Sequence, residues 1–162
     1  MLIESKNRKY TCCFTGHRPK KLKQSEEEIK IGLEKYIRQA VADGFLIFVS
    51  GMCFGVDLWA AEVVIKLRDE DSAIKLVCAS PYKGFERNWS EDWQNRYNAV
   101  LQAADEVYYV SAEHCKGCYQ IRNRWLIDKS SRVIAAYNGQ SGGTKNTINY
   151  AKSQQIEVCN VI

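Results

Sequence analysis

Short apolar runs alternate along the chain with longer segments in which apolar residues recur at every third or fourth position. The short runs are typical of buried strands, and the periodic segments are typical of helices that pack one face against a sheet. The expected strands span residues 10–14, 45–50, 74–79, 106–110, 133–137 and 157–161. Helices are expected from about residue 25 to 44, 56 to 67, 89 to 104, 119 to 130 and 144 to 154.

The expected strands and helices follow one another in strict alternation. A parallel neighbour in a sheet is reached through a crossover, which is usually a helix. The pattern therefore predicts one domain, residues 1–162, with a single-domain Rossmann-like three-layer α/β/α fold and a mostly parallel sheet. Such sheets bind ligands beyond the carboxyl ends of their strands. The loops expected there are 15–20, 51–55, 81–88, 111–118 and 138–143, which hold most of the glycines and both histidines.

A glycine-punctuated turn follows the second expected strand and leads into a helix. Gly51 and Gly55 admit backbone angles closed to other residues, so that amides of this turn can converge near the helix N-terminus. We expect the turn, together with Ser50, to contact a phosphate. Asp57 either caps the helix or accepts a hydrogen bond from a ribose hydroxyl, and capping is favoured because a carboxylate repels phosphate. The alternative is a plain strand-to-helix turn without a ligand.

A second glycine-rich turn, residues 138–144, precedes the last expected helix. Asn138, Gly142, Gly143 and Thr144 combine backbone freedom, an amide and a hydroxyl at a helix start, where phosphates bind. Thr144 is also suited to cap this helix in the absence of any ligand. We expect this turn and the turn that begins at Gly51 to form one phosphate site.

The loop after the first expected strand adds a third group of candidates, Thr15, Gly16, His17 and Arg18. It lies at the edge of the sheet where a ligand is expected. Arg18 can grip a phosphate with two parallel hydrogen bonds, and His17 can donate to it or move a proton. The alternative is a polar turn with Arg18 in water.

The composition is that of a globular protein, with 46% hydrophobic and 26% charged residues. No apolar run approaches the roughly 20 residues of a membrane span, and the polar N-terminus lacks the apolar centre of a signal peptide, so we expect a cytoplasmic protein. The net charge of +4 favours phosphate ligands but is weak for a dedicated DNA-binding domain.

Five of the seven cysteines are expected to pack as small apolar residues. Cys115 and Cys118 form one CxxC pair, which supplies only two of the four ligands of a structural zinc site and does not follow the first strand of a thioredoxin-like unit. We expect no metal.

Four ordered motifs together carry a family resemblance: TGHRPKKL at 15–22, SGMCFGVDLWAAE at 50–62, YQIRNRWLIDKSS at 119–131 and GGT at 142–144. With them the chain resembles the YpsA-like branch of the SLOG superfamily over nearly its whole length. The resemblance implies a Rossmann-like fold related to the DNA-processing protein DprA and to the lysine-decarboxylase-like (LOG) enzymes. LOG enzymes hydrolyse the N-glycosidic bond of nucleoside monophosphates. The resemblance also implies a nucleotide or a nucleotide-derived ligand.

The LOG pattern carries over at some positions and fails at others. An arginine of LOG enzymes falls at Arg122, and their loop GT falls at Gly143 and Thr144, but their catalytic glutamate falls at Thr147. Arg124 points away from Arg122 on the same helix and is expected to be exposed. With Thr147 at the place of the glutamate, the acid/base group of the hydrolases is missing. Any catalysis would rely on Arg122 and on His17, Asp57 or another carboxylate such as Glu62 or Glu86 as the acid/base group.

The preferred hypothesis is that the protein binds or senses a nucleotide or nucleotide-derived ligand, such as an ADP-ribose-like molecule or a nucleoside phosphate, through two glycine-rich phosphate loops. Such a protein needs no cofactor. One alternative is a LOG-like nucleotide hydrolase, and another is a DprA-like binder of single-stranded DNA, suggested by the lysines after Pro19. The expected partner is a small molecule, with nucleic acid less favoured, no membrane, and a possible homodimer.

Overall fold

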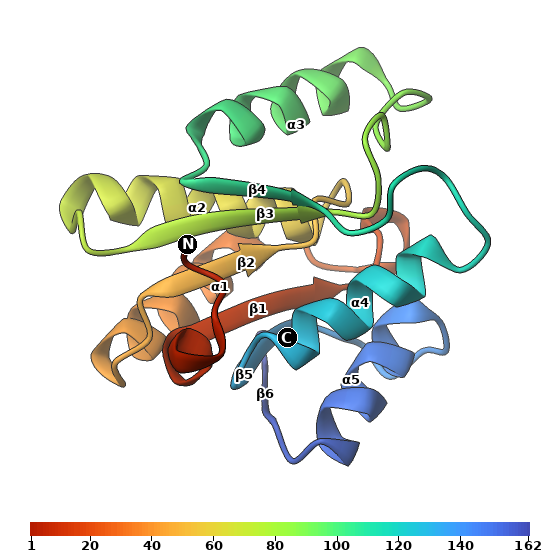
Figure 1. The fold of residues 1–162 in the computed structure, drawn as a ribbon. Coiled ribbons are helices and arrows are strands. Elements are labelled where there is room, and N and C mark those ends of the chain that lie inside the picture. Colours follow the sequence, from red (N-terminus) through yellow and green to blue (C-terminus); the bar gives the residue numbers. More distant parts are fainter.

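The computed structural model describes residues 1–162 and contains one sheet of six strands, all parallel (Figure 1). The order across the sheet is β4-β3-β2-β1-β5-β6. The strands are β1 (Thr11–Gly16), β2 (Ile47–Ser50), β3 (Lys75–Ser80), β4 (Glu106–Tyr109), β5 (Arg132–Ala136) and β6 (Glu157–Asn160). The predicted Rossmann-like α/β fold is confirmed.

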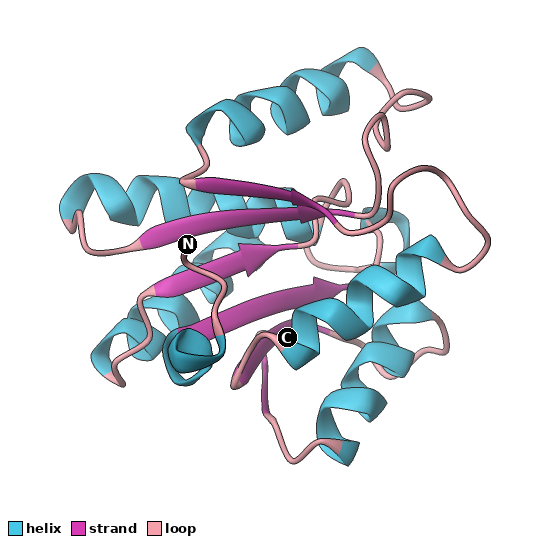
Figure 2. Ribbon diagram, viewed as in Figure 1, coloured by secondary structure: helices cyan, strands magenta, loops and turns pink.

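Five helices cover the two faces of the sheet, and Figure 2 separates them from the strands by colour. They are α1 (Glu26–Ala42), α2 (Val56–Glu70), α3 (Glu91–Ala103), α4 (Cys118–Asp128) and α5 (Gly143–Ser153). Helices α1, α2 and α3 pack on one face, and α4 and α5 lie together on the other (Figure 1). Two short 3₁₀ helices, η1 (Ser5–Tyr10) and η2 (Pro19–Lys21), were not expected from the sequence. No helix combines the length and the apolar composition that a membrane span requires.

Neighbouring residues of each strand enter opposite halves of the core, as a pleated strand between two helical layers requires. In β1, Cys12 and Phe14 pack under α1 and α2, while Cys13 packs under α4 and α5. The five cysteines expected to pack in the interior are free thiols that are buried or half-buried. Burial raises the pKa of Cys13 and of Cys78 to about 12, so these thiols stay protonated.

The strand order reverses beside β1, and in sheets of this kind such a reversal opens a crevice. The chain leaves β1 for α1 on one face of the sheet and leaves its neighbour β5 for α5 on the other face. Loops that part in this way open a crevice at the carboxyl edge. The loops after β1, β2 and β5 and the first turns of α4 and α5 meet there (Figure 1).

Candidate functional site

A cavity of about 400 Å³ lies in this crevice. Eight of the predicted contact residues line it: Thr15, Gly16, His17, Arg18, Asp57, Arg122, Gly143 and Thr144. The other lining residues are Phe14, Lys20, Lys21, Cys53, Tyr119 and Asn123, none of which was among the predicted contacts. Ser50, Gly51, Gly55, Asn138 and Gly142 were predicted to contact the ligand but do not line the cavity.

The end of β1 forms one wall of the cavity. A Cβ on Gly16 would lie 2.7 Å from three side-chain atoms of Val56, so the glycine allows β1 to meet the N-terminus of α2. The side chain of His17 is buried, and its Nε2 has no hydrogen-bond partner. Burial and the nearby Lys21 ammonium lower the pKa of His17, which keeps the imidazole neutral. This ring therefore has one nitrogen available for a ligand.

The turn between β2 and α2 is closed by its own hydrogen bonds. The Ser50 hydroxyl donates to the carbonyl of Asp57 at 2.8 Å and accepts from the Met52 N–H at 3.2 Å. The Asp57 carboxylate accepts from the Cys53 N–H at 3.2 Å, and the residue that caps α2 is Gly55. The prediction that Asp57 caps the helix is therefore wrong. Both Ser50 and Asp57 stabilise the turn from within.

Gly51 lies behind the cavity, beneath Asp57 and Arg122. Its carbonyl accepts a hydrogen bond from the Arg122 guanidinium, and a Cβ here would lie 2.9 Å from Asp57 Oδ2 and 3.0 Å from an Arg122 nitrogen. Gly55 has a φ of 93° and packs its backbone against Pro19. These two glycines serve close packing and turn geometry, while the surface of the cavity is formed by other residues.

Arg122 is the most deeply placed cation of the cavity, with 5% of its surface exposed. Its Nε donates to Asn123 Oδ1 at 2.8 Å, and no carboxylate lies within ion-pair distance of it. Arg124, two residues further along α4, is exposed as predicted. The helix therefore turns one arginine into the cavity and the other toward solvent.

Asp57 is the only carboxylate among the residues that line the cavity, whereas Arg18, Lys20, Lys21 and Arg122 bring four cations. Burial raises the pKa of Asp57, and the nearby Arg122 guanidinium and the Cys53 N–H partly offset this rise. The first turns of α2 and α5 add backbone N–H groups that have no partner within their helices. The cavity is therefore electropositive and suited to an anion.

The turn between β5 and α5 is more exposed than the turn at Gly51. Gly142 caps α5 with a φ of 141°, and Thr144 lies inside the first turn without capping it, contrary to the alternative role proposed for it. The Asn138 amide donates to the Lys21 carbonyl at 2.8 Å, and the Lys21 ammonium donates to the Ser141 carbonyl at 3.3 Å. Asn138 thus ties this turn to the loop after β1.

Two further features bear on chemistry. Thr147, at the place of the LOG glutamate, is buried and donates its hydroxyl to the Gly143 carbonyl of its own helix at 2.8 Å. Cys115 and Cys118 form a disulfide at the start of α4, a pairing to which sequence reasoning gave no role. The disulfide lies directly before Tyr119, which lines the cavity.

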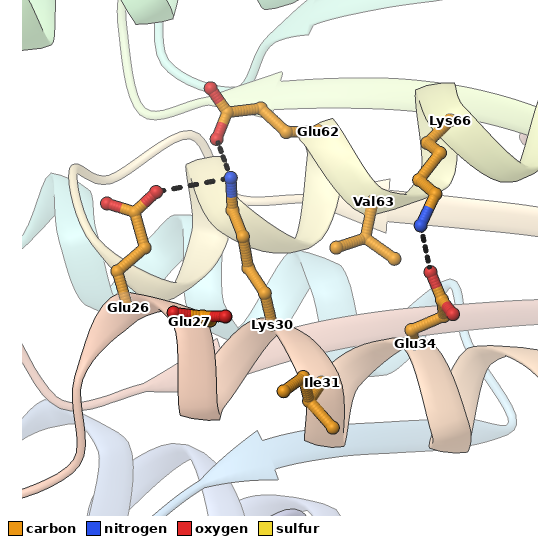
Figure 3. Close-up of a pocket in the computed structure, with 8 residues that line it drawn as sticks. All are labelled: Glu26, Glu27, Lys30, Ile31, Glu34, Glu62, Val63 and Lys66. Carbon is orange, nitrogen blue, oxygen red and sulfur yellow. Dashed lines mark hydrogen bonds and ion pairs between the residues drawn. The ribbon is translucent and has the colours of Figure 1, made fainter.

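Another hollow, of about 510 Å³, lies between α1 and α2 (Figure 3). Both of its lysines are paired with glutamates across the two helices: Lys30 pairs with Glu62 at 3.0 Å, and Lys66 pairs with Glu34 at 2.7 Å. Because both lysines are paired and carboxylates are in excess, this hollow offers less to an anion than the cavity at the carboxyl edge.

Comparisons with known proteins agree with the family resemblance seen in the sequence. The YpsA family model, described as the YspA SLOG family, matches residues 12–160. A UPF0398 protein of Halalkalibacterium halodurans is 32% identical over 130 residues, which is 78% of this chain and 69% of that protein. The uncharacterised SPbeta prophage-derived protein YoqJ of Bacillus subtilis is 34% identical over 117 residues, which is 65% of this chain and 68% of YoqJ.

Among solved structures, DprA from Streptococcus pneumoniae matches with a TM-score of 0.66 and 19% identity. The match covers 93% of this chain and 49% of DprA, so this chain spans about half of that protein. DprA from Helicobacter pylori, whose structure is described for its single-stranded DNA binding mode, matches with a TM-score of 0.63 and 20% identity over 96% of this chain and 67% of that one. These likenesses concern the fold.

Proposed function

The chain belongs to the YspA SLOG family, and from that premise we propose that it binds a nucleotide or nucleotide-derived ligand whose phosphate lies in the cavity at the carboxyl edge of the sheet. The observation that carries the proposal is the burial of the Arg122 guanidinium without an ion-pair partner. A guanidinium that is 95% buried costs much free energy unless a partner compensates its charge, and the Asp57 carboxylate beside it lies beyond ion-pair distance. A phosphate at the cavity would supply that partner.

Three other features support a phosphate at this place. Arg18, Lys20 and Lys21 face the cavity and form no ion pair within the protein. Helix α5 begins at Gly143, where N–H groups and the helix dipole favour an anion. The free Nε2 of His17 adds a hydrogen-bonding group on the β1 side.

The proposed activity is binding rather than hydrolysis. The LOG glutamate is replaced by Thr147, whose hydroxyl is bonded to its own helix. Asp57, the remaining carboxylate of the cavity, accepts from the Cys53 N–H and lies against Arg122. A general acid/base needs a carboxyl group within reach of the scissile bond, and we propose that Asp57 has a structural role instead.

A second candidate ligand is single-stranded DNA, because the fold is similar to that of DprA and because Lys20 and Lys21 extend the cationic wall at the cavity rim. Phosphates of a strand would use the same side chains as the phosphate of a mononucleotide. Binding that falls steeply with salt and strengthens with oligonucleotide length would favour DNA over a small molecule.

Calorimetric titration with pyrophosphate, AMP, ADP-ribose, NAD and cyclic dinucleotides tests the proposal. We expect binding of at least one of them, and Arg122→Met should weaken it about 10- to 100-fold through the loss of charge-assisted hydrogen bonds. Arg124→Met, on the exposed side of the same helix, is the matched control and should leave pyrophosphate affinity within about twofold. Thermal melts check that both variants fold. No binding of any ligand at millimolar concentrations, or equal losses of pyrophosphate affinity in the two variants, would contradict the proposal.

A further inference from the structure

A groove of about 370 Å³ between α4 and α5 adjoins the phosphate cavity. Its lining differs in kind from that of the cavity, because most of it consists of uncharged polar side chains. Four carboxamides face it, Gln120 and Asn123 from α4 and Asn146 and Asn149 from α5. No carboxylate lines the groove, so it offers little to a metal ion or to a basic peptide.

The carboxamides are available for a ligand. Gln120, Asn146 and Asn149 are exposed, and their side chains make no hydrogen bond within the protein. Each presents a donor and an acceptor side by side, and this pattern matches the donor and acceptor edge of a nucleobase. Carboxamides in such a groove therefore distinguish a base from a plain sugar phosphate.

Arg124 gives the groove a flat surface as well. Its guanidinium lies 5.1 Å from the centre of the Tyr150 ring, and the Tyr150 hydroxyl donates to Asp128 at 2.7 Å, which holds the ring in place. Guanidinium planes stack on bases as readily as on aromatic rings. The groove therefore combines a stacking surface with hydrogen-bonding edges.

Asn123 connects the groove to the cavity, because it lines both. Its Oδ1 accepts from Arg122 Nε, and its Nδ2 lies 3.9 Å from the position of a Cβ on Gly143, at the start of α5. Asn149 lies five residues beyond Thr144 on α5, which is about 7.5 Å along the helix axis. A ribose is of a size to bridge such a gap.

We propose that the α4–α5 groove binds the nucleobase of a nucleotide whose phosphate occupies the cavity. Asn146 and Asn149 recognise the edge of the base, and Arg124 stacks on its face. This inference rests on the proposed function, since it takes the phosphate site as its starting point.

The test compares wild type with the double variant Asn146→Ala/Asn149→Ala, using pyrophosphate, ribose 5-phosphate and the four nucleoside monophosphates AMP, GMP, CMP and UMP. At least one monophosphate should bind wild type more tightly than ribose 5-phosphate. The double variant should weaken that monophosphate at least about tenfold and leave ribose 5-phosphate and pyrophosphate unchanged. Asn95→Ala/Asn98→Ala, two exposed asparagines at the same spacing on α3, should change none of the affinities.

The outcomes separate the two proposals. If pyrophosphate and ribose 5-phosphate bind but no monophosphate binds more tightly than ribose 5-phosphate, the groove proposal fails and the phosphate site stands. An equal loss for all ligands in the double variant, or no loss for any, also overturns the groove proposal. If none of the ligands binds to wild type, the proposed function fails, and the groove proposal fails with it.

Discussion

The turn of residues 51–57 is buried and closed by its own hydrogen bonds, whereas the turn of residues 138–144 lies largely in solvent. In the first turn, Gly51 leaves room for Asp57 and Arg122, and its carbonyl fixes the guanidinium. In the second, the segment from Asn138 to Ser141 is exposed and is tied to the loop after β1 through Lys21. Two glycine-rich turns with similar sequences therefore have different roles: the first positions the Arg122 guanidinium, and the second leaves its backbone exposed.

The largest expected effect is on stability, when one glycine in each turn is replaced by alanine. Gly51→Ala forces a Cβ within 3.0 Å of the Asp57 carboxylate and should lower the free energy of unfolding by about 2 kcal/mol. Gly143→Ala, at the first position of α5, meets nothing closer than 3.9 Å and should be neutral or stabilise by up to about 1 kcal/mol. Urea denaturation of the two variants measures both values. Equal losses would show that the two turns are packed alike.

The next largest effect concerns how Asp57, the carboxylate within the buried turn, makes the free energy of unfolding depend on pH. Because burial raises the pKa of Asp57, the folded protein holds this proton to a higher pH than the unfolded chain does. The contribution of Asp57 to the free energy of unfolding is therefore full below about pH 4, and it falls as pH rises through the folded pKa. Asp57→Asn should remove this fall while keeping an acceptor for the Cys53 N–H.

Urea denaturation of wild type and Asp57→Asn over a series of pH values measures how the difference in their free energy of unfolding changes with pH. Asp69→Asn, at an exposed position of the same helix, is the control and should parallel wild type. The neutral variant should also bind pyrophosphate more tightly, because a carboxylate beside the phosphate has been removed. A variant that runs parallel to wild type at every pH would mean that the carboxylate is not desolvated.

The smallest effect is expected in the exposed turn. Asn138→Ala loses the bond to the Lys21 carbonyl and the acceptor for the Gln140 N–H, both at the surface, and should cost less than about 1 kcal/mol. Ser50→Ala removes the equivalent pair of bonds inside the buried turn and should cost about 1–2 kcal/mol. Thermal unfolding of the two variants ranks them, and a reversed order would contradict the conclusion that the hydrogen bonds of the buried turn, residues 51–57, stabilise the protein more.

Much of the fold follows from the order of apolar patterns. Alternating strands and helices specify a parallel sheet, and a parallel sheet brings the loops after β1, β2 and β5 to one edge. The sequence therefore led to His17, Arg18 and Thr144 without any knowledge of the structure. Arg122 came from the family resemblance, since nothing in its own helix distinguishes it from Arg124.

The sequence did not show which polar groups are already occupied by hydrogen bonds within the protein. Ser50 and Gly51 were expected at the ligand, yet their bonds go to Met52, Asp57 and Arg122. Arg122 lies 71 residues from Gly51 in the sequence, and local pattern carries no information about such an approach. Lys20 and Lys21 were noted only as a basic cluster, because their position over the cavity depends on the 3₁₀ turn Pro19–Lys21.

The strand order has a consequence for how the contact between Arg122 and Gly51 depends on the complete fold. The chain runs from the edge strand β4 back across β3, β2 and β1 before β5 pairs with β1, and helix α4 with Arg122 belongs to that crossover. The contact between Arg122 and Gly51 joins segments that are 71 residues apart in the sequence, so it requires the turn after β2 and helix α4 to be in place together. A ligand held by Arg122 would bind the complete fold alone and stabilise it by mass action. Amide hydrogen exchange with and without ligand should accordingly slow across the whole sheet together, edge strand β4 included, rather than only beside the site.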